Sequence, residues 1–405
     1  MKIMIINTFY SPNMIGGTEH SIKLLAETLL KRGHEVAIFT IDSNVNKSTI
    51  EFINGVKIFR SGNTYFDYKV RFFEKNKSAK KLMMRIIEGC NFKIQKDFDW
   101  TLKYFYPDVI HTNNLYGISP YIWELAYKYQ IPVLHTLRDY FMLEPNSLVK
   151  KNDLFHVYLK KIYKEYFKFF TRYVSGVTAP SSFILMKYLE EGYFQKTEKK
   201  RIWNAINIDQ EKINQEIMAK KKRKKDKTIY LYVGALLEIK GIYILLEAFN
   251  RIKDERVELR ICGEGPLKKI VENSVEKNPK IKYLGQLEKK ELDIQRKESD
   301  VAIISSIWDE PFGRVIIEAN EFGLPIIGSN KGGIKEVLEF MKTGILYEAM
   351  DINDLVDKIL YMKNKENRVA FIENIKEAIV HFDIETQVDQ FESMYKKIIS
   401  KVNLD

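Results

Sequence analysis

Short apolar runs alternate with amphipathic stretches along the first half of the chain. The runs are rich in Ile, Val, Leu and Phe, as buried strands are. After the first run, Ile22, Leu25, Ala26, Leu29 and Leu30 recur with the spacing of one helix face. The predicted strands are 2–8, 35–40, 56–60, 108–113, 132–137 and 174–180. Strands separated by helices predict a parallel sheet with crossover helices.

A second series of the same kind begins near residue 228. Its predicted strands are 228–234, 257–263, 281–285, 300–306 and 325–328. Between the two series, residues 209–227 are polar and end in the basic run AKKKRKKDK. We interpret the stretch as interdomain and its basic run, residues 219–227, as a linker or helix end exposed to water, with a nucleic-acid or lipid patch as the alternative for the run.

The pattern therefore predicts an α/β protein with two Rossmann-like domains. We expect an N-terminal acceptor-side domain over 1–207, a C-terminal donor domain over 208–385, and a helix over 386–405 that crosses back to the N-terminal domain. A chain of 405 residues suits two domains. Because ligands of open parallel sheets bind at the carboxyl ends of the strands, we expect the site at those edges.

Composition indicates the cellular compartment of the protein and the charge of its partners. The two cysteines, Cys90 and Cys262, are isolated, which excludes a disulfide framework and fits a reducing compartment. Residues 3–9 are too short for a signal peptide, and no apolar run approaches the ~20 residues of a spanning helix. We expect a cytoplasmic protein. The formal net charge of +11 favours an anionic partner.

The segment 309–337 is the most informative part of the sequence. Glu310 precedes an expected helix start at Phe312 or Gly313, and Glu318 lies eight residues further, about two helical turns later. The free N–H groups and positive dipole end of such a helix can hold a diphosphate without a metal. Glu318 could then accept hydrogen bonds from a ribose diol, and Glu310 could face a sugar ring. Acidic residues in the first turns of surface helices are also common, so the two glutamates alone do not distinguish a binding site from an ordinary surface helix.

The context of these glutamates resembles the Glu-x7-Glu signature of family 4 glycosyltransferases, which have the GT-B fold of two Rossmann-like domains with parallel sheets facing a central cleft. Further motifs stand in the order of that family along nearly the whole chain. They are GGTE, PDVIHT, APSSF, NAINID, VGALLEIKG, GEGP, LPIIGS, GGIKEV and TGILY.

The resemblance implies roles for particular residues. The implied catalytic residues are Glu310, Lys240, His111, Asn113 and Arg138. The implied donor-binding residues are Gly16, Gly17, Lys240, Gly263, Glu264, Gly285, Glu310, Phe312, Gly313, Arg314 and Glu318. Lys240 would contact the donor diphosphate. No metal site is expected.

Three positions depart from the family pattern. Ala235 stands where relatives commonly carry an arginine, and Arg314 is a candidate substitute. Asn113 and Arg138 stand where relatives often carry histidines. Because arginine stays protonated and cannot act as a base, either the acceptor chemistry differs or these side chains only position groups. His111 has the alternative of being an ordinary core residue.

By the same resemblance, the chain should transfer a hexose-type sugar with retention of configuration. It would use a nucleotide sugar, UDP-linked by preference or GDP-linked, and no other cofactor. The acceptor would be a hydroxyl of a glycan or lipid-linked molecule in cell-surface polysaccharide or glycolipid synthesis. The alternatives are a catalytically impaired glycosyltransferase-like binding protein and another nucleotide-sugar enzyme such as an epimerase. No nucleic-acid partner is expected.

Two segments of the N-terminal half are both basic and aromatic. They are residues 69–87 and residues 147–173, the second with the spacing of an amphipathic helix. These segments predict peripheral contact with the anionic inner face of a cell membrane. The alternative is that the aromatic residues pack into the core and leave the lysines in water.

Overall fold

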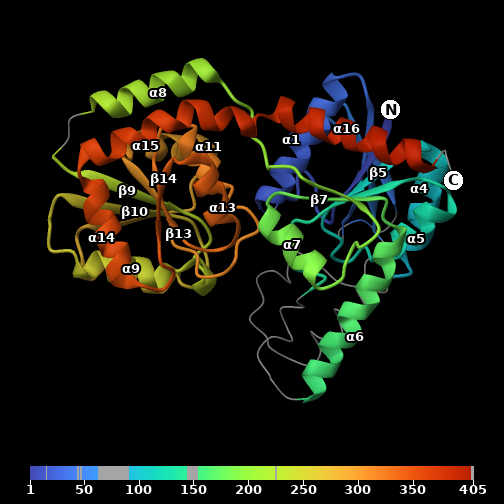
Figure 1. Ribbon diagram of the computed structural model, residues 1–405, viewed down its shortest axis with the longest axis horizontal. Coiled ribbons are helices and arrows are strands. Elements are labelled where there is room, and N and C mark those ends of the chain that lie inside the picture. Colours follow the sequence, from blue (N-terminus) through green and yellow to red (C-terminus); the bar gives the residue numbers. More distant parts are fainter. Residues whose placement is uncertain are drawn as a thin grey trace. The chain divides into compact units, whose positions relative to one another are not determined.

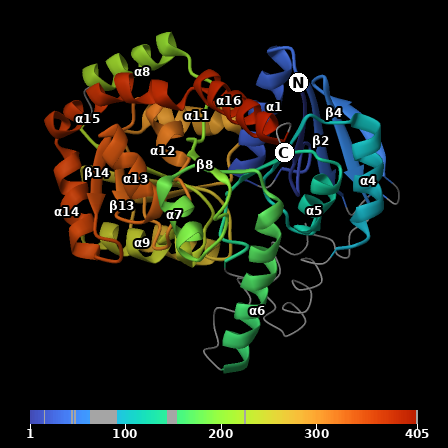
Figure 2. The same ribbon diagram turned by 45° about the vertical axis from the view of Figure 1, so that its right-hand side comes forward.

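The computed structural model describes residues 1–14, 16–42, 45, 48–62, 91–143, 154–223 and 226–402. The predicted membrane segment 69–87, and residues 147–153 of the second one, lie outside this description. The chain divides into two compact units, one of Met1–Trp203 with Ile384–Asp405 and the other of Asn204–Asp383. Each unit contains a sheet covered by helices (Figures 1 and 2).

The first unit is built on a sheet with the order β3-β4-β2-β1-β5-β6-β7-β8 among the described residues. Its strands are β1 (Lys2–Ile6), β2 (Glu35–Ile41), β3 (Thr49–Ile53), β4 (Val56–Ser61), β5 (Val109–Thr112), β6 (Val133–Thr136), β7 (Gly176–Ala179) and β8 (Glu198–Arg201). Neighbouring strands are parallel except β3, which pairs antiparallel with β4. The inner strands are buried on both faces, as parallel sheets require, which explains their continuous apolar runs.

The helices of the first unit bury the apolar stripes that the sequence predicts. They are α1 (Gly17–Lys31), α4 (Ile94–Phe105), α5 (Tyr121–Lys128), α6 (Leu154–Phe170), the 3-10 turn η1 (Thr171–Tyr173), α7 (Ser182–Glu190) and α16 (Ile384–Val402). In α1, Ile22, Leu25, Ala26 and Leu29 are fully buried. The C-terminal helix α16 packs on α1, where Arg32 binds Glu385 at 2.5 Å and Asp389 at 2.6 Å.

The second unit contains a parallel sheet with the order β11-β10-β9-β12-β13-β14. Its strands are β9 (Thr228–Val233), β10 (Val257–Cys262), β11 (Ile281–Gly285), β12 (Val301–Ile304), β13 (Ile326–Ser329) and β14 (Gly344–Tyr347). Its helices are α8 (Gln210–Lys222), η2 (Glu238–Lys240), α9 (Ile242–Arg251), α10 (Lys268–Lys277), α11 (Lys289–Glu298), α12 (Val315–Asn320), α13 (Gly332–Met341), α14 (Ile352–Lys363), α15 (Lys365–Ala378) and η3 (Ile379–Phe382). Every strand predicted from the apolar runs is present, with small changes at the ends.

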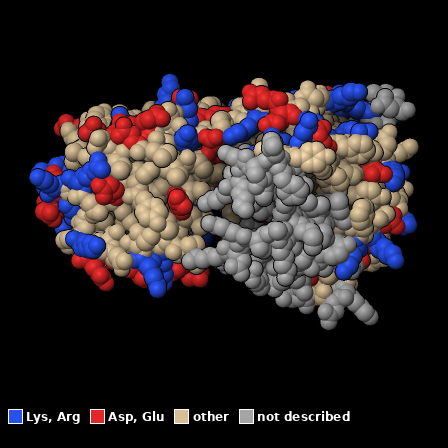
Figure 3. Space-filling view, turned by 90° about the horizontal axis from the view of Figure 1, so that it is seen from below, with Lys and Arg blue, Asp and Glu red and all other residues tan. Residues whose placement is uncertain are grey.

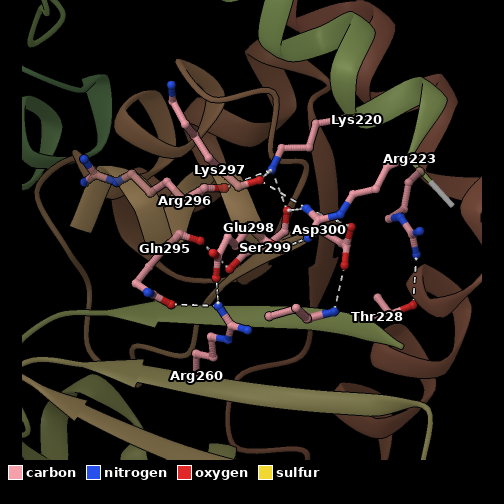
Figure 4. Close-up of polar contacts among 12 residues, drawn as sticks. Lys220, Arg223, Thr228, Arg260, Gln295, Arg296, Lys297, Glu298, Ser299 and Asp300 are labelled. Atoms are coloured by element: carbon pink, nitrogen blue, oxygen red, sulfur yellow. Dashed lines mark hydrogen bonds and ion pairs between the residues drawn. The ribbon is translucent and has the colours of Figure 1, made fainter. Parts of the chain in front are cut away.

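The interpretation of 209–227 as an interdomain linker is wrong for most of its length, whereas the helix end expected in its basic run is present at residues 219–222. Residues 210–222 form α8, which lies along α15 in Figures 1 and 2 and buries Ile213 and Ile217. Two members of the basic run turn inward, as Figure 4 shows, toward the segment from Arg296 to Asp300. Lys220 Nζ donates to the carbonyl oxygens of Lys297 and Ser299, each at 2.6 Å.

Arg223 completes this arrangement by donating to the carbonyl oxygen of Ser299 at 2.9 Å. These carbonyl groups end α11, where no helical partner remains and the dipole is negative. Lys220 and Arg223 therefore cap a helix end that lies more than 70 residues further along the chain.

Candidate active site

Lys240 and Glu310 meet at the carboxyl edge of the second sheet. Lys240 ends η2 after β9, and Glu310 lies in the loop after the neighbouring strand β12. Lys240 Nζ lies 2.6 Å from Glu310 Oε1, and the two side chains are 26% and 15% exposed. The hydroxyl of Ser306 donates to the same carboxylate oxygen. An ammonium group and a carboxylate, both partly accessible, thus stand where ligands of parallel sheets bind.

The backbone beside Lys240 is fixed by a close contact with the loop after β12. Gly241 has a φ of +72°, and a Cβ at this position would lie 1.8 Å from the carbonyl oxygen of Ser305. Only glycine tolerates both conditions. Ser305 Oγ in turn donates to the carbonyl oxygen of Lys240 at 2.8 Å. The lysine is therefore anchored at its backbone while its amine faces Glu310.

A second glycine contact fixes the backbone of Glu310. Gly332 begins α13, and a Cβ there would lie 2.6 Å from the carbonyl oxygen of Glu310. The amide of Gly333 donates to that same oxygen at 2.7 Å. The glycine pair of the GGIKEV motif thus lets the start of α13 pack directly on the loop that carries Glu310.

Glu318 lies in a different setting from the one predicted. The helix expected to start at Phe312 or Gly313 begins instead at Val315 and has only six residues. Glu310 lies outside the helix, as expected, but only three residues of helix precede Glu318, so the two glutamates are not two helical turns apart. A helix this short also contributes little dipole at its N-terminus.

Two arginines hold the carboxylate of Glu318. Arg314 Nε donates to Glu318 Oε1 at 2.7 Å, and Arg296 Nη2 donates to Oε2 at 2.8 Å. Arg296 comes from α11, is 8% exposed, and also binds Asp293 at 3.2 Å. Arg314, the candidate substitute for the missing arginine, therefore makes an ion pair with Glu318.

The remaining predicted donor residues of the second unit form one group of loop contacts. The amide of Gly263 donates to the carbonyl oxygen of Gly285 at 2.8 Å, which joins the loops after β10 and β11. Glu264 binds Lys268 at 2.9 Å and accepts from the hydroxyl of Tyr283 at 3.0 Å. Phe312 is buried against Phe382, so its ring fills the core. Gly313 has a φ of +89°.

In the first unit, Asn113 and Arg138 come together at the carboxyl edge. They follow the neighbouring strands β5 and β6, and Arg138 Nε donates to Asn113 Oδ1 at 3.0 Å. Among the described residues, the buried amide nitrogen of Asn113 has no hydrogen-bond partner. Gly16 and Gly17 stand at the start of α1, after β1, which neighbours β5. The amide of Gly16 is already bound to Glu19 Oε2 at 2.8 Å.

His111 lies in the core of the first unit. It is 0% exposed, and its two ring nitrogens lie 2.7 Å from the hydroxyls of Tyr395 and Thr136. Burial, together with the positive charge of Arg138 and the neighbouring His135, lowers the pKa of His111 well below its usual range. Burial and Arg138 also lower the pKa of His135 to about 3. A neutral imidazole with both nitrogens bonded favours the structural role for His111 over the catalytic one.

Two residues of this arrangement were missed in the sequence. Ser306 lies two residues after β12, and the sequence pattern includes it only as the last residue of the predicted strand 300–306. Arg296 lies in the polar helix α11, far from every motif, and no local signal distinguishes it from its neighbours.

Within the described part of the chain, no group of three or more His, Cys, Asp or Glu side chains could hold a metal ion.

Comparison with protein-family models matches both units. Residues 15–210 match the model described as Glycosyltransferase Family 4, and residues 213–378 match the model of Glycosyl transferases group 1. An uncharacterized 42.6 kDa protein from the cps region of Klebsiella pneumoniae is 30% identical over 363 residues, which cover 88% of this chain and 91% of that protein. The chain belongs to glycosyltransferase family 4. It is a glycosyltransferase of the class that uses nucleotide sugars, which confirms the family predicted from the signature and its context.

Solved structures agree on the GT-B fold. Sucrose-phosphate synthase from Thermosynechococcus elongatus superposes with a TM-score of 0.73 at 20% identity, covering 99% of each chain. Anabaena Alr3699/HepE in complex with UDP-glucose has a TM-score of 0.65 at 16% identity, covering 98% of this chain and 100% of that one. This glycosyltransferase thus has the predicted pair of α/β units with parallel sheets. The individual roles of its site residues remain predictions.

Proposed function

We propose that this glycosyltransferase moves a hexose-type sugar from a UDP-sugar, or alternatively a GDP-sugar, to a hydroxyl of a glycan or lipid-linked acceptor. We place it in cell-surface polysaccharide or glycolipid synthesis at the cytoplasmic side of the membrane. The Klebsiella relative from a cps region and the UDP-glucose complex of Anabaena HepE support this choice. The donor diphosphate would lie at the carboxyl edge of the second sheet.

The observation that carries the proposal is the Lys240–Glu310 pair. In the transfer, the bond between the anomeric carbon and the phosphate oxygen breaks, and the acceptor oxygen forms the new bond. Negative charge then collects on the leaving diphosphate, which the ammonium group of Lys240 would stabilise. A phosphate oxygen takes the acceptor proton, so the reaction needs no protein base. Glu310 would orient Lys240 and contact the sugar ring.

The first unit would supply the acceptor side. Its buried Asn113 amide nitrogen could donate to a sugar hydroxyl, while Arg138 fixes the other end of the amide. Neither residue can remove a proton at neutral pH. This supports a positioning role for both, consistent with proton transfer to the phosphate.

The proposal predicts a selective response to donors. UDP-sugars should raise the melting temperature of the protein more than GDP-, ADP- or CDP-sugars, because a ligand stabilises the folded state that binds it. With the stabilising donor and an acceptor glycan, NMR of the product should give the anomeric configuration of the donor. Inversion would contradict the retaining mechanism, and stabilisation by every nucleotide alike would contradict a specific donor.

A lipid-linked acceptor is supported by the exposed face of α6. In Figures 1 and 2 this helix projects away from the sheet of the first unit. Tyr163, Phe167 and Phe170 are buried in the core. Val157, Tyr158, Ile162 and Phe169 are exposed on the opposite face. Aromatic burial and an exposed apolar face thus occur on the same helix. No helix in the described ranges is long and apolar enough to cross a membrane.

The α6 face predicts binding to anionic vesicles. Insertion of the exposed apolar side chains into the bilayer favours membrane binding. Nearby lysines such as Lys161 add attraction to an anionic surface, each by about 1 kcal/mol. Co-sedimentation should increase with phosphatidylserine content and decrease with salt. Tyr158→Ser with Ile162→Ser should lower it at least fivefold.

The matched control changes exposed apolar residues of the second unit. Met218→Ser with Ile294→Ser should leave vesicle binding unchanged, since these side chains lie on α8 and α11. If the parent protein ignores anionic vesicles at low salt, a soluble acceptor becomes the better assignment.

A further inference from the structure

A basic pocket lies at the amino ends of the strands of the second sheet, whereas the candidate active site lies at their carboxyl ends. It has a volume of about 420 Å³ and sits beside Thr228, the first residue of β9, whereas Lys240 follows the last residue of that strand. Six basic side chains and two acidic ones line it. They are Arg223, Lys227, Arg256, Lys363, Lys365 and Arg368, with Asp226 and Asp300. On the face of the second unit seen in Figure 3, several Lys and Arg side chains lie at the left-hand end, with Asp and Glu side chains among them.

The pocket collects cations from separate segments of the chain. Arg223 and Lys227 belong to the part of the basic run that follows α8. Arg256 precedes β10, and Lys363 and Arg368 come from α14 and α15. The structure therefore gives the basic run a second purpose beyond capping α11. Arg223 of the run lines the same concave site as Arg368, which lies 145 positions further along the chain.

Two guanidinium groups, those of Arg223 and Arg368, line this site, and neither residue is fully exposed. Arg368 Nη1 donates to the carbonyl oxygens of Met362 at 2.6 Å and Lys363 at 2.8 Å. Arg223 Nη1 lies 3.5 Å from Asp300 Oδ1, and Asp300 Oδ2 also accepts from the amide of Ile229 at 2.8 Å. Burial and the positive charge of Arg223 lower the pKa of Arg368, although Asp300 opposes this. The positive charge of Arg223 thus acts on Arg368, and a bound anion would offset it.

Some of the basic side chains that line the pocket form ion pairs with carboxylates, and others do not. Asp254 binds Arg256 at 3.1 Å and also pairs with Lys363. Within the described residues, the structure shows no ion pair for Lys227 or Lys365. Two ammonium groups at the rim thus complement the guanidinium groups inside, an arrangement suited to an anion with more than one charge.

We propose that this pocket binds a small multivalent phosphate, such as a diphosphate or a phosphorylated sugar, at a site separate from that of the nucleotide sugar. The concave shape favours a small molecule over a flat bilayer or a nucleic-acid duplex. Because the two sites lie at opposite edges of the sheet, the phosphate does not displace the nucleotide.

Isothermal titration with inorganic pyrophosphate tests the site. The full chain is first saturated with UDP, so that the donor diphosphate position is filled. Pyrophosphate should then bind at one site per chain, and Lys227→Glu with Lys365→Glu should weaken this binding at least tenfold. The control Lys277→Glu with Lys376→Glu changes two exposed lysines outside the pocket by the same total charge and should weaken binding less than threefold.

Several results would overturn the proposal. One is the absence of pyrophosphate binding to the UDP-saturated protein, and another is equal weakening by both pairs of substitutions, which would indicate unspecific screening. A third is loss of vesicle or nucleic-acid binding in the Lys227/Lys365 variant without any change for pyrophosphate. Should UDP itself fail to bind, the titration is made on the unliganded chain and on Lys240→Ala. Unchanged binding in that variant still supports a site apart from Lys240.

Discussion

Lys240→Ala is expected to lower kcat by about 10²–10³-fold at saturating donor, the size seen when a preorganised group that stabilises developing charge is removed. Lys240 is the cation fixed nearest to Glu310, with its backbone clamped by Gly241 and Ser305. The melting temperature should change little, because a partly exposed ion pair contributes little to stability. Initial rates of nucleotide release over a range of donor concentrations give kcat and KM separately.

A double-mutant cycle with Glu310→Gln separates the roles of the two residues. If Glu310 acts only by orienting Lys240, the double variant should be no slower than Lys240→Ala alone. A further loss in the double variant indicates a direct contact of Glu310 with the sugar. Lys253→Ala, which removes an exposed lysine of the same unit, should keep the parent rate. Activity of Lys240→Ala within about twofold of the parent would remove Lys240 from the leaving-group site.

The sheet strands that could be predicted are those buried on both faces. In β1 and β12, apolar side chains point to both sides, so the sequence shows an uninterrupted apolar run. The edge strand β8 has the sequence EKKR and carries no such signal, and β3 is largely exposed. Register and strand pairing of these edges depend on neighbours distant in sequence, so local patterns could not reveal them.

The basic run 219–227 shows why charge patterns mislead when read locally. Lysines and arginines in a polar stretch are usually exposed, so the pattern predicts a linker or helix end surrounded by water. Lys220 is instead 6% exposed, because the carbonyl groups at the end of α11 replace its water. Nothing within the run announces a helix end more than 70 residues away.

The candidate site was predicted where its residues lie in motifs and missed where they do not. Lys240 and Glu310 lie in the connections that follow two neighbouring strands, so their meeting at the carboxyl ends of those strands follows from the order of a parallel sheet. Ser306 and Arg296 act through side-chain geometry that requires the packed structure. The sequence predicts too early a start for the short helix α12, because Pro-Phe-Gly is typical of a helix start, whereas Gly313 here adopts a left-handed φ.

Glu318→Gln is expected to weaken nucleotide binding by about 10- to 150-fold, the equivalent of the ~1.5–3 kcal/mol that a hydrogen bond to a charged group contributes. Each carboxylate oxygen of Glu318 already accepts one hydrogen bond, from Arg314 or from Arg296. Each keeps a second lone pair, which can accept from a ribose hydroxyl. The two arginines thus hold the carboxylate in place before the nucleotide arrives, which lowers the ordering cost of binding.

The same arrangement makes Glu318→Ala a poor test, because it would leave Arg296 and Arg314 facing each other without a shared anion. Glutamine keeps the shape and one acceptor oxygen while it removes the charge. The decisive measurement compares UDP with its 2′-deoxy and 3′-deoxy analogues by titration calorimetry. The parent enzyme should bind at least one deoxy analogue more than tenfold more weakly than UDP, whereas Glu318→Gln should bind all three within about threefold. A Glu318→Gln enzyme that still rejects the deoxy analogues as the parent does would show that another group recognises the ribose.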